Sequence, residues 1–112
     1  MTLRLLALLA ALAPFPAAAC TGTLATWYDY PRARWTASGE RFDVNAMTAA
    51  SPTLPFGTRV RVRYRGRSVE VRITDRMPAR RDCRVLDLTL GAFRMLGDPR
   101  RGVLPMRMEI VR

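Results

Sequence analysis

The sequence contains no histidine and no lysine, and only two of its 112 residues are cysteine. Without histidine, no Ser-His-Asp triad, no Cys-His dyad and no imidazole-based zinc or iron site can be built. Two cysteines alone do not make a metal site either, so we expect no metal and no other cofactor. If the protein is an enzyme, its proton transfers must therefore be made by Asp, Glu or Tyr.

Apolar runs long enough to cross a membrane are also missing, since a spanning helix needs about 20 apolar residues without prolines. The longest run covers residues 5–13, between Arg4 and residues 14–19, which contain two prolines and end in three alanines. This arrangement is typical of a cleavable secretory signal peptide. We expect residues 1–19 to be removed and residues 20–112 to form one domain, in the periplasm or secreted, without a transmembrane segment.

The two cysteines, Cys20 and Cys83, leave two interpretations open. An even number of cysteines in an exported chain predicts one disulfide bond, which would help to stabilise so small a domain. Alternatively, Cys20 carries the lipid of a bacterial lipoprotein, anchors the protein to a membrane and leaves Cys83 spare. Ala17 stands three positions before Cys20, where lipid attachment usually wants a bulky aliphatic residue, so the sequence favours the bridge.

Positive charge comes entirely from arginine. The chain has 19 arginines against 9 acidic residues, and its net charge is +10. A field of this sign favours polyanions. For an exported bacterial protein these are the peptide carboxylates of peptidoglycan, the phosphates of teichoic acid or lipopolysaccharide, and anionic lipid surfaces. Nucleic acid is not an expected partner in that compartment.

Residues 59–73 alternate strictly between apolar and charged side chains on both sides of Gly66. This pattern predicts a β-hairpin that turns at Arg65 and Gly66. The side chains expected on its inner face are Val60, Val62, Tyr64, Val69, Val71 and Ile73. The arginines between them would point outward, either as a solvated strand face or as a dedicated anion-binding surface.

The remaining elements are short. Residues 22–28 and 106–111 are expected to be the first and last strands, and one helix should begin after Thr89 as its N-cap and stop at Gly97. Its apolar stripe would be Leu90, Phe93 and Leu96. Many short strands with a single helix favour a mainly β fold, a compact barrel rather than a layered α/β fold.

Six different short motifs occur one after another along residues 25–89. They read ATWY, TASGERFD, AMTAA, TLPFGT, TDRMP and LDLT, at residues 25–28, 36–43, 46–50, 53–58, 74–78 and 86–89. In this order and spacing they resemble the rare lipoprotein A family of double-psi β-barrels, over residues 22–111. The resemblance implies a six-stranded double-psi β-barrel with one or two short helices, expected as a monomer. The family includes lytic transglycosylases that cleave peptidoglycan glycan strands, and it shares its architecture with expansins.

The resemblance assigns the catalytic acid/base to Asp75 and a second carboxylate to Glu40. In a lytic transglycosylase one carboxyl group protonates the glycosidic oxygen, and the 6-hydroxyl of the sugar then attacks, leaving a 1,6-anhydromuramic end. Ser51 stands where active relatives generally have a histidine, and a hydroxyl does not titrate near neutral pH. Structural roles are the alternative for both carboxylates: an Asx turn or an ion pair with Arg76 for Asp75, and a loop or cap for Glu40.

Four further residues are candidates for substrate binding. Tyr28 and Trp35 could stack on sugar rings, although core packing is the alternative for any aromatic side chain of this chain. If residues 22–28 alternate as a strand, either Trp27 or Tyr28 must point inward. Arg76 follows the catalytic candidate, and Asp87 matches the family but directly precedes the expected helix, where a structural role is equally open.

Three functions are therefore compatible with the sequence. The first is a glycan-cleaving enzyme that uses Asp75, with Glu40 assisting. The second is a non-catalytic, expansin-like module that binds peptidoglycan glycan strands. The third is an exported polyanion binder without sugar specificity. Retention of both carboxylates favours the enzyme, while the replacement of histidine by Ser51 leaves its activity open.

Overall fold

A computed structural model describes residues 23–30 and 34–112. The expected signal peptide and Cys20 lie outside the described residues, so the cleavage and the bridge to Cys83 stay predictions. Within the described part of the chain, no helix has the length and apolar character needed to cross a membrane.

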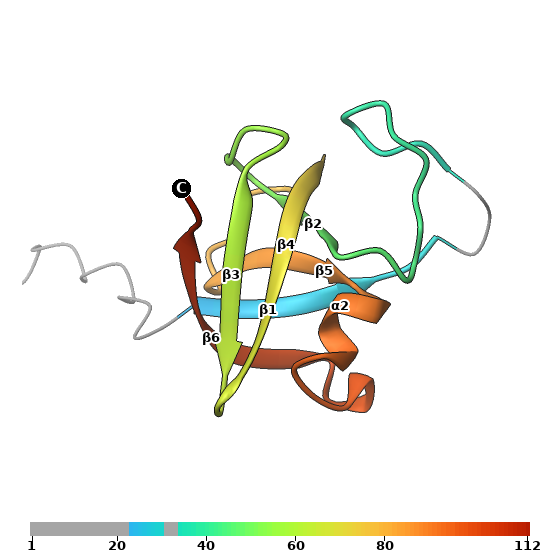
Figure 1. Cartoon of the computed structure of the whole chain (residues 1–112). Helices are drawn as coiled ribbons and strands as arrows, with labels where there is room; N and C mark the ends of the chain where they lie inside the picture. Colours follow the sequence, from blue (N-terminus) through green and yellow to red (C-terminus); the bar gives the residue numbers. More distant parts are fainter. Residues whose placement is uncertain (1–22, 31–33) are drawn as a thin grey trace, which may run out of the picture.

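Six strands form a closed barrel (Figure 1). They are β1 (Thr23–Tyr28), β2 (Thr48–Ser51), β3 (Arg59–Tyr64), β4 (Arg67–Arg76), β5 (Arg84–Thr89) and β6 (Val103–Ile110). Around the barrel the order is β1-β5-β2-β4-β3-β6. Strands β1 and β5 are parallel, as are β2 and β4, and the other neighbours are antiparallel. The predicted mainly β, double-psi barrel is confirmed.

The β3–β4 hairpin lies where the alternation predicts it. All six side chains expected on its inner face are buried in the core. The turn residues Arg65 and Gly66 have φ angles of 46° and 78°. Positive values at both central positions are typical of the type I′ turn, whose twist matches that of the flanking strands. Strand β4 continues to Arg76, three residues beyond the predicted end, because it also pairs with β2.

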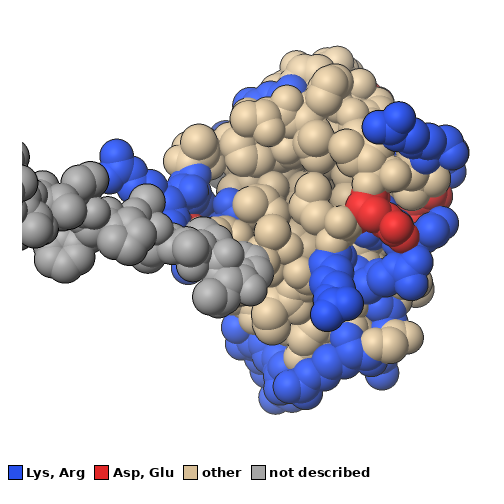
Figure 2. All heavy atoms as spheres, turned by 90° about the vertical axis from the view of Figure 1, so that its left-hand side faces the viewer, with Lys and Arg blue, Asp and Glu red and all other residues tan. Residues whose placement is uncertain are grey.

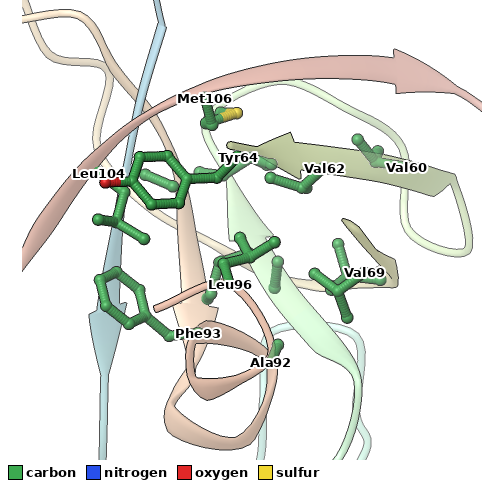
Figure 3. Packing of buried hydrophobic residues seen from close by; sticks show 14 of the residues in the cluster. Val60, Val62, Tyr64, Val69, Ala92, Phe93, Leu96, Leu104 and Met106 are labelled. Atoms are coloured by element: carbon green, nitrogen blue, oxygen red, sulfur yellow. The ribbon is translucent and has the colours of Figure 1, made fainter. Parts of the chain in front are cut away.

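One end of the barrel is closed by the helix α2 (Leu90–Arg94). Thr89 caps it as predicted, because its hydroxyl accepts a hydrogen bond from the Ala92 amide at 3.2 Å. Phe93 and Leu96 pack into the core beside Leu104 (Figure 3). Their burial removes large apolar surfaces from water and is the main driving force for closing the barrel here.

Three elements differ from the sequence-based expectation. Strand β6 begins at Val103 rather than Met106, and the short 3-10 helix η1 (Pro99–Arg101) precedes it, capped by Asp98. Strands β2 and β5 were not expected as strands. Strand β2 is only four residues long, and in β5 the adjacent apolar residues Val85 and Leu86 interrupt the alternation.

Candidate active site

A β-bulge sets the direction of the Asp75 side chain. In the pairing of β2 with β4, Ala49 lies opposite Ile73 and Ala50 lies opposite Asp75, so Thr74 is an extra residue. Because side chains alternate along a strand, Asp75 would otherwise share the core-facing side with Ile73. The extra residue shifts the alternation by one and turns Asp75 away from the apolar core. Bulges of this kind commonly re-aim a side chain beside an active site.

Asp75 is 5% exposed and has four hydrogen-bond donors. The backbone amides of Ala37 and Arg76 both donate to Oδ1 at 2.9 Å. The hydroxyls of Tyr28 and Tyr30 donate to Oδ2 at 3.1 and 3.3 Å. These donors come from three separate parts of the chain, so a buried carboxylate is compensated and held in one orientation.

Three aromatic rings form the wall beside this carboxylate. The Tyr28 and Tyr30 ring centroids are 5.4 Å apart, and the Phe42 ring lies 5.1 and 4.9 Å from them. Burial, followed by the neighbouring charge of Asp75, raises the pKa of Tyr28 and that of Tyr30 above their ordinary value. Both tyrosines therefore remain neutral hydrogen-bond donors to Asp75 at physiological pH.

A second carboxylate lies on the same face, two strands away. Ala50 is opposite Asp75 on β4 and opposite Asp87 on β5, and Asp87 in turn pairs with Thr26 on β1. The Thr26 hydroxyl donates to Asp87 Oδ1 at 2.9 Å. Burial raises the pKa of Asp87, Thr26 opposes that shift, and the charge of Asp75 adds to it. The small side chain of Ala50 thus separates two acidic groups.

Glu40 has a different environment. Its carboxylate forms a two-pronged ion pair with the Arg72 guanidinium, and both side chains are 45% exposed. This interaction lowers the pKa of Glu40. The backbone of its loop is tied to the Asp75 region, since the Ser38 amide donates to the Thr74 carbonyl oxygen at 3.0 Å. Glu40 therefore lies on a loop that touches the site, while its carboxylate is engaged at the surface.

Ser51 and Arg76 organise the loop that follows β2. Ser51 is buried, and its Oγ accepts hydrogen bonds from the amides of Thr53 and Leu54 at 3.2 and 2.9 Å. The Arg76 guanidinium donates to the carbonyl oxygens of Ser51 and Leu54 at 2.9 and 2.8 Å. It also lies 4.3 Å from the centre of the Phe56 ring. An ion pair between Asp75 and Arg76 was one predicted alternative. Instead, Asp75 contacts Arg76 through the Arg76 backbone amide.

The aromatic candidates have different environments: Trp27 packs on the core, whereas Tyr28 faces the site and Trp35 is exposed. Trp27 packs against the core and donates from Nε1 to the Pro99 carbonyl oxygen at 2.8 Å, so Tyr28 faces the site. Trp35 is 73% exposed, on the loop that carries Ala37. Its ring is therefore open to solvent rather than packed in the core, and a contact with the ligand stays a prediction.

Four contributors to the site were not named as such from the sequence: the Ala37 amide, Tyr30, Phe42 and Thr26. An amide donor carries no side-chain signal, and Tyr30 and Phe42 lie outside any regular strand. The Thr26 side chain could have been placed, since it shares a strand face with Tyr28. Among the described residues, no group of three or more potential metal ligands occurs.

Comparison with known proteins identifies the family of the chain. Residues 21–108 match the family model described as lytic transglycolase. The chain belongs to this family. A probable endolytic peptidoglycan transglycosylase RlpA of Nostoc sp. (strain PCC 7120) is 58% identical over 80 residues, which are 70% of this chain and 21% of that relative. The endolytic peptidoglycan transglycosylase RlpA of Neisseria meningitidis serogroup B is 40% identical over 88 residues, which are 76% and 36% of the two chains.

The chain thus spans about a fifth of the first relative and about a third of the second. Two solved structures resemble this chain over 82% of its length. A Streptomyces papain inhibitor has a TM-score of 0.67 and 26% identity, covering 82% of this chain and 94% of its own. An apo expansin of Clavibacter michiganensis has a TM-score of 0.66 and 27% identity, covering 82% of this chain and 50% of its own. The shared architecture is the double-psi barrel.

Proposed function

We propose that this protein acts on the glycan strands of peptidoglycan as a lytic transglycosylase, with Asp75 as the acid/base. The observation that carries the proposal is the arrangement of Asp75, which is turned out of the core by a bulge and held beside an aromatic wall. The two relatives above, named as peptidoglycan transglycosylases, support the choice of substrate. Their named substrate also supports export and work outside the cytoplasm.

The reaction needs one group that gives a proton and then takes one. The Asp75 carboxyl group protonates the glycosidic oxygen as that bond breaks, and the resulting carboxylate accepts the proton of the 6-hydroxyl as this oxygen attacks the anomeric carbon. No water is consumed, and the product ends in a 1,6-anhydro ring. In this scheme Tyr28 and Tyr30 orient Asp75, while Trp35 and the Asp87–Thr26 pair contact the sugars.

Digestion of purified peptidoglycan, followed by mass spectrometry of the soluble products, tests this proposal. The wild-type protein should release fragments with 1,6-anhydromuramic ends. Asp75→Asn keeps an oxygen for the two backbone amides but cannot transfer the proton, so product formation should fall by at least about 100-fold. Asp82→Asn, which changes the charge equally on an exposed loop, is the matched control and should retain activity. Equal activity of both variants would refute the assignment of Asp75.

The role of position 51, where active relatives generally have a histidine, can be tested separately. Ser51→His restores the residue that active relatives generally carry, and it should raise the rate of anhydro-product formation if that position takes part in proton transfer. Since Ser51 is 1% exposed and caps the following turn, the variant needs a parallel measurement of Tm. A folded Ser51→His protein without a rate increase would exclude a role for this position.

A second candidate function is a non-catalytic, expansin-like module that binds peptidoglycan. It is favoured by the engagement of Glu40 with Arg72, by the loop-capping role of Ser51, and by the likeness to an expansin. This alternative predicts that the protein sediments with purified sacculi without releasing fragments. Trp35→Ala should then weaken sedimentation, while Phe56→Ala, which removes another exposed ring, serves as the control.

A further inference from the structure

Four arginines surround a hollow at the end of the barrel opposite Asp75. The hollow has a volume of about 610 Å³ and is lined by Arg63, Arg65, Arg67 and Arg107. Strand β4 runs for ten residues from this end to the Asp75 end, which separates the two by roughly 25 Å at about 3.3 Å per residue. Figure 2 shows arginine gathered along the lower edge of the molecule, the end at which the β3–β4 hairpin turns in Figure 1.

Two core side chains, Tyr64 and Met106, also line this hollow. Tyr64 is 8% exposed and Met106 is 6% exposed, and both belong to the core. The Tyr64 hydroxyl accepts a hydrogen bond from Arg101, which lines a smaller hollow next to the first.

Elsewhere on the same outward face, the arginines are neutralised by glutamates. Arg59 pairs with Glu70 at 2.8 Å, and Arg72 pairs with Glu40. Arg61 lies 3.5 Å from Glu109. The outward-pointing arginines Arg59, Arg61 and Arg72 of the hairpin therefore form a solvated strand face, one of the two predicted roles.

At the hollow the compensation is only partial, because among its four arginines Arg63 alone has an ion pair within the described residues, with Glu109 at 2.9 Å. Within residues 23–30 and 34–112, no ion pair involves Arg65, Arg67 or Arg107, and Arg63 shares Glu109 with Arg61. Arg63 and Arg107 are also direct cross-strand neighbours of β3 and β6. Like charges in such a position destabilise a sheet, and an anion that binds between them would relieve the repulsion.

Besides the repulsion between Arg63 and Arg107, the backbone conformation of Arg65 is unfavourable. Its φ of 46° lies in the left-handed region, where a type I′ turn usually has Asn, Asp or Gly. A residue with a Cβ is disfavoured in this conformation. Its guanidinium lies 5.4 Å from the centre of the Tyr64 ring, directly beside the hollow. Unfavourable backbone conformations of this kind occur preferentially at ligand sites.

We infer that this hollow is a binding site for a phosphate-bearing anion, independent of the proposed glycan site at the other end of the barrel. Guanidinium groups match phosphate oxygens in two-pronged hydrogen bonds, and several uncompensated arginines favour a ligand with more than one negative charge. A phosphomonoester or diphosphate meets both conditions, whereas one carboxylate supplies a single charge. The source is either the headgroup of an anionic lipid or a soluble phosphate compound.

Calorimetric titration of the full chain with inorganic pyrophosphate tests this inference. The wild-type protein should bind pyrophosphate, and Arg67→Gln/Arg107→Gln should weaken binding by at least about tenfold, because it removes two charge-assisted contacts. The control Arg94→Gln/Arg112→Gln removes two exposed arginines outside the hollow and should change the affinity little. Circular dichroism verifies the fold of each variant, and Arg65→Gln replaces the double variant if that one does not fold.

Three outcomes would overturn the inference: no pyrophosphate binding by the wild-type protein, an equal loss in the hollow and control variants, or citrate binding as tightly as pyrophosphate. A second arm compares phosphatidylcholine vesicles with and without phosphatidic acid. Vesicle binding that depends on Arg67 and Arg107 identifies a lipid headgroup as the source, whereas pyrophosphate binding without vesicle binding identifies a soluble phosphate. Since neither arm involves glycan cleavage, Asp75→Asn should behave as wild type in both.

Discussion

The two ends of the barrel differ in how far their charged side chains are compensated by neighbouring groups. At one end, Asp75 is buried and every donor around it is directed at its two oxygens. At the other end, four arginines surround a hollow; Arg63 pairs with Glu109, but Arg65, Arg67 and Arg107 form no ion pair within the described residues. A compensated buried charge organises the protein around it, while an uncompensated exposed cluster is free to receive a ligand.

Removal of Asp75 should have the largest effect on stability. Asp75→Ala leaves two backbone amides and two hydroxyls without their acceptor and frees the loop of Ala37, so we expect a loss of about 2–4 kcal/mol in the free energy of unfolding. Urea denaturation measures this loss. Asp75→Asn keeps most of the hydrogen bonds and should lose much less, and a similar loss in both variants would show that the charge, not the acceptors, holds the loop.

Two tyrosines permit a direct comparison of the ends. Tyr28→Phe removes a hydroxyl that donates to a buried carboxylate and should cost about 1.5 kcal/mol. Tyr64→Phe removes a hydroxyl that accepts from the exposed Arg101, which water can solvate instead, and should cost only about 0.5 kcal/mol. Urea denaturation of both variants gives the two values. Equal costs would mean that Asp75 gains no particular stabilisation from Tyr28.

Asp87 provides a test of pH dependence at the acidic end. Its pKa is raised in the folded protein by burial, so the carboxylate form costs stability, and this cost grows as the pH rises through the folded pKa. Asp87→Asn removes the charge and keeps an acceptor for Thr26. The variant should therefore have a higher Tm than the wild type at pH 7, and the difference should vanish as the pH falls toward the ordinary value of 3.8. Thermal unfolding at several pH values measures it, and a lower Tm at pH 7 would contradict the raised pKa.

The smallest effect is expected at the basic end, and it has the opposite sign to that of Asp75. Arg107→Gln removes the like charge opposite Arg63 and should stabilise the protein by about 0.2–0.5 kcal/mol at low ionic strength. In 0.5 M salt the gain should largely disappear, because screening already weakens the repulsion. Thermal unfolding at the two salt concentrations checks this. A loss of stability would indicate a partner for Arg107 that the described residues do not contain.

Much of the barrel could be predicted because its strands obey simple alternation. The inner face of the hairpin, the first strand and the Thr89 cap follow from period and residue type alone. Strands β2 and β5 could not be predicted in that way, because β2 is too short to show a pattern and the adjacent Val85 and Leu86 interrupt the alternation of β5. The choice between Trp27 and Tyr28 as the inward residue was likewise open until the packing partners were known.

For the site, the sequence by itself determined which chemistry is available. The absence of histidine leaves the carboxyl groups and tyrosines as proton-transfer groups, and the family motifs single out Asp75 among them. It also determined the large excess of arginine. These properties depend on composition and local order, which no folding step can change.

Only the tertiary structure decided where these groups act. Asp75 faces the site because Thr74 is an extra residue opposite β2, and this pairing joins segments that are distant in sequence. The same long-range pairings place Glu40 on Arg72, and they leave Arg107 beside Arg63. Side-chain direction in a sheet depends on register, and register is set by the partner strand, so it cannot be read from either strand alone.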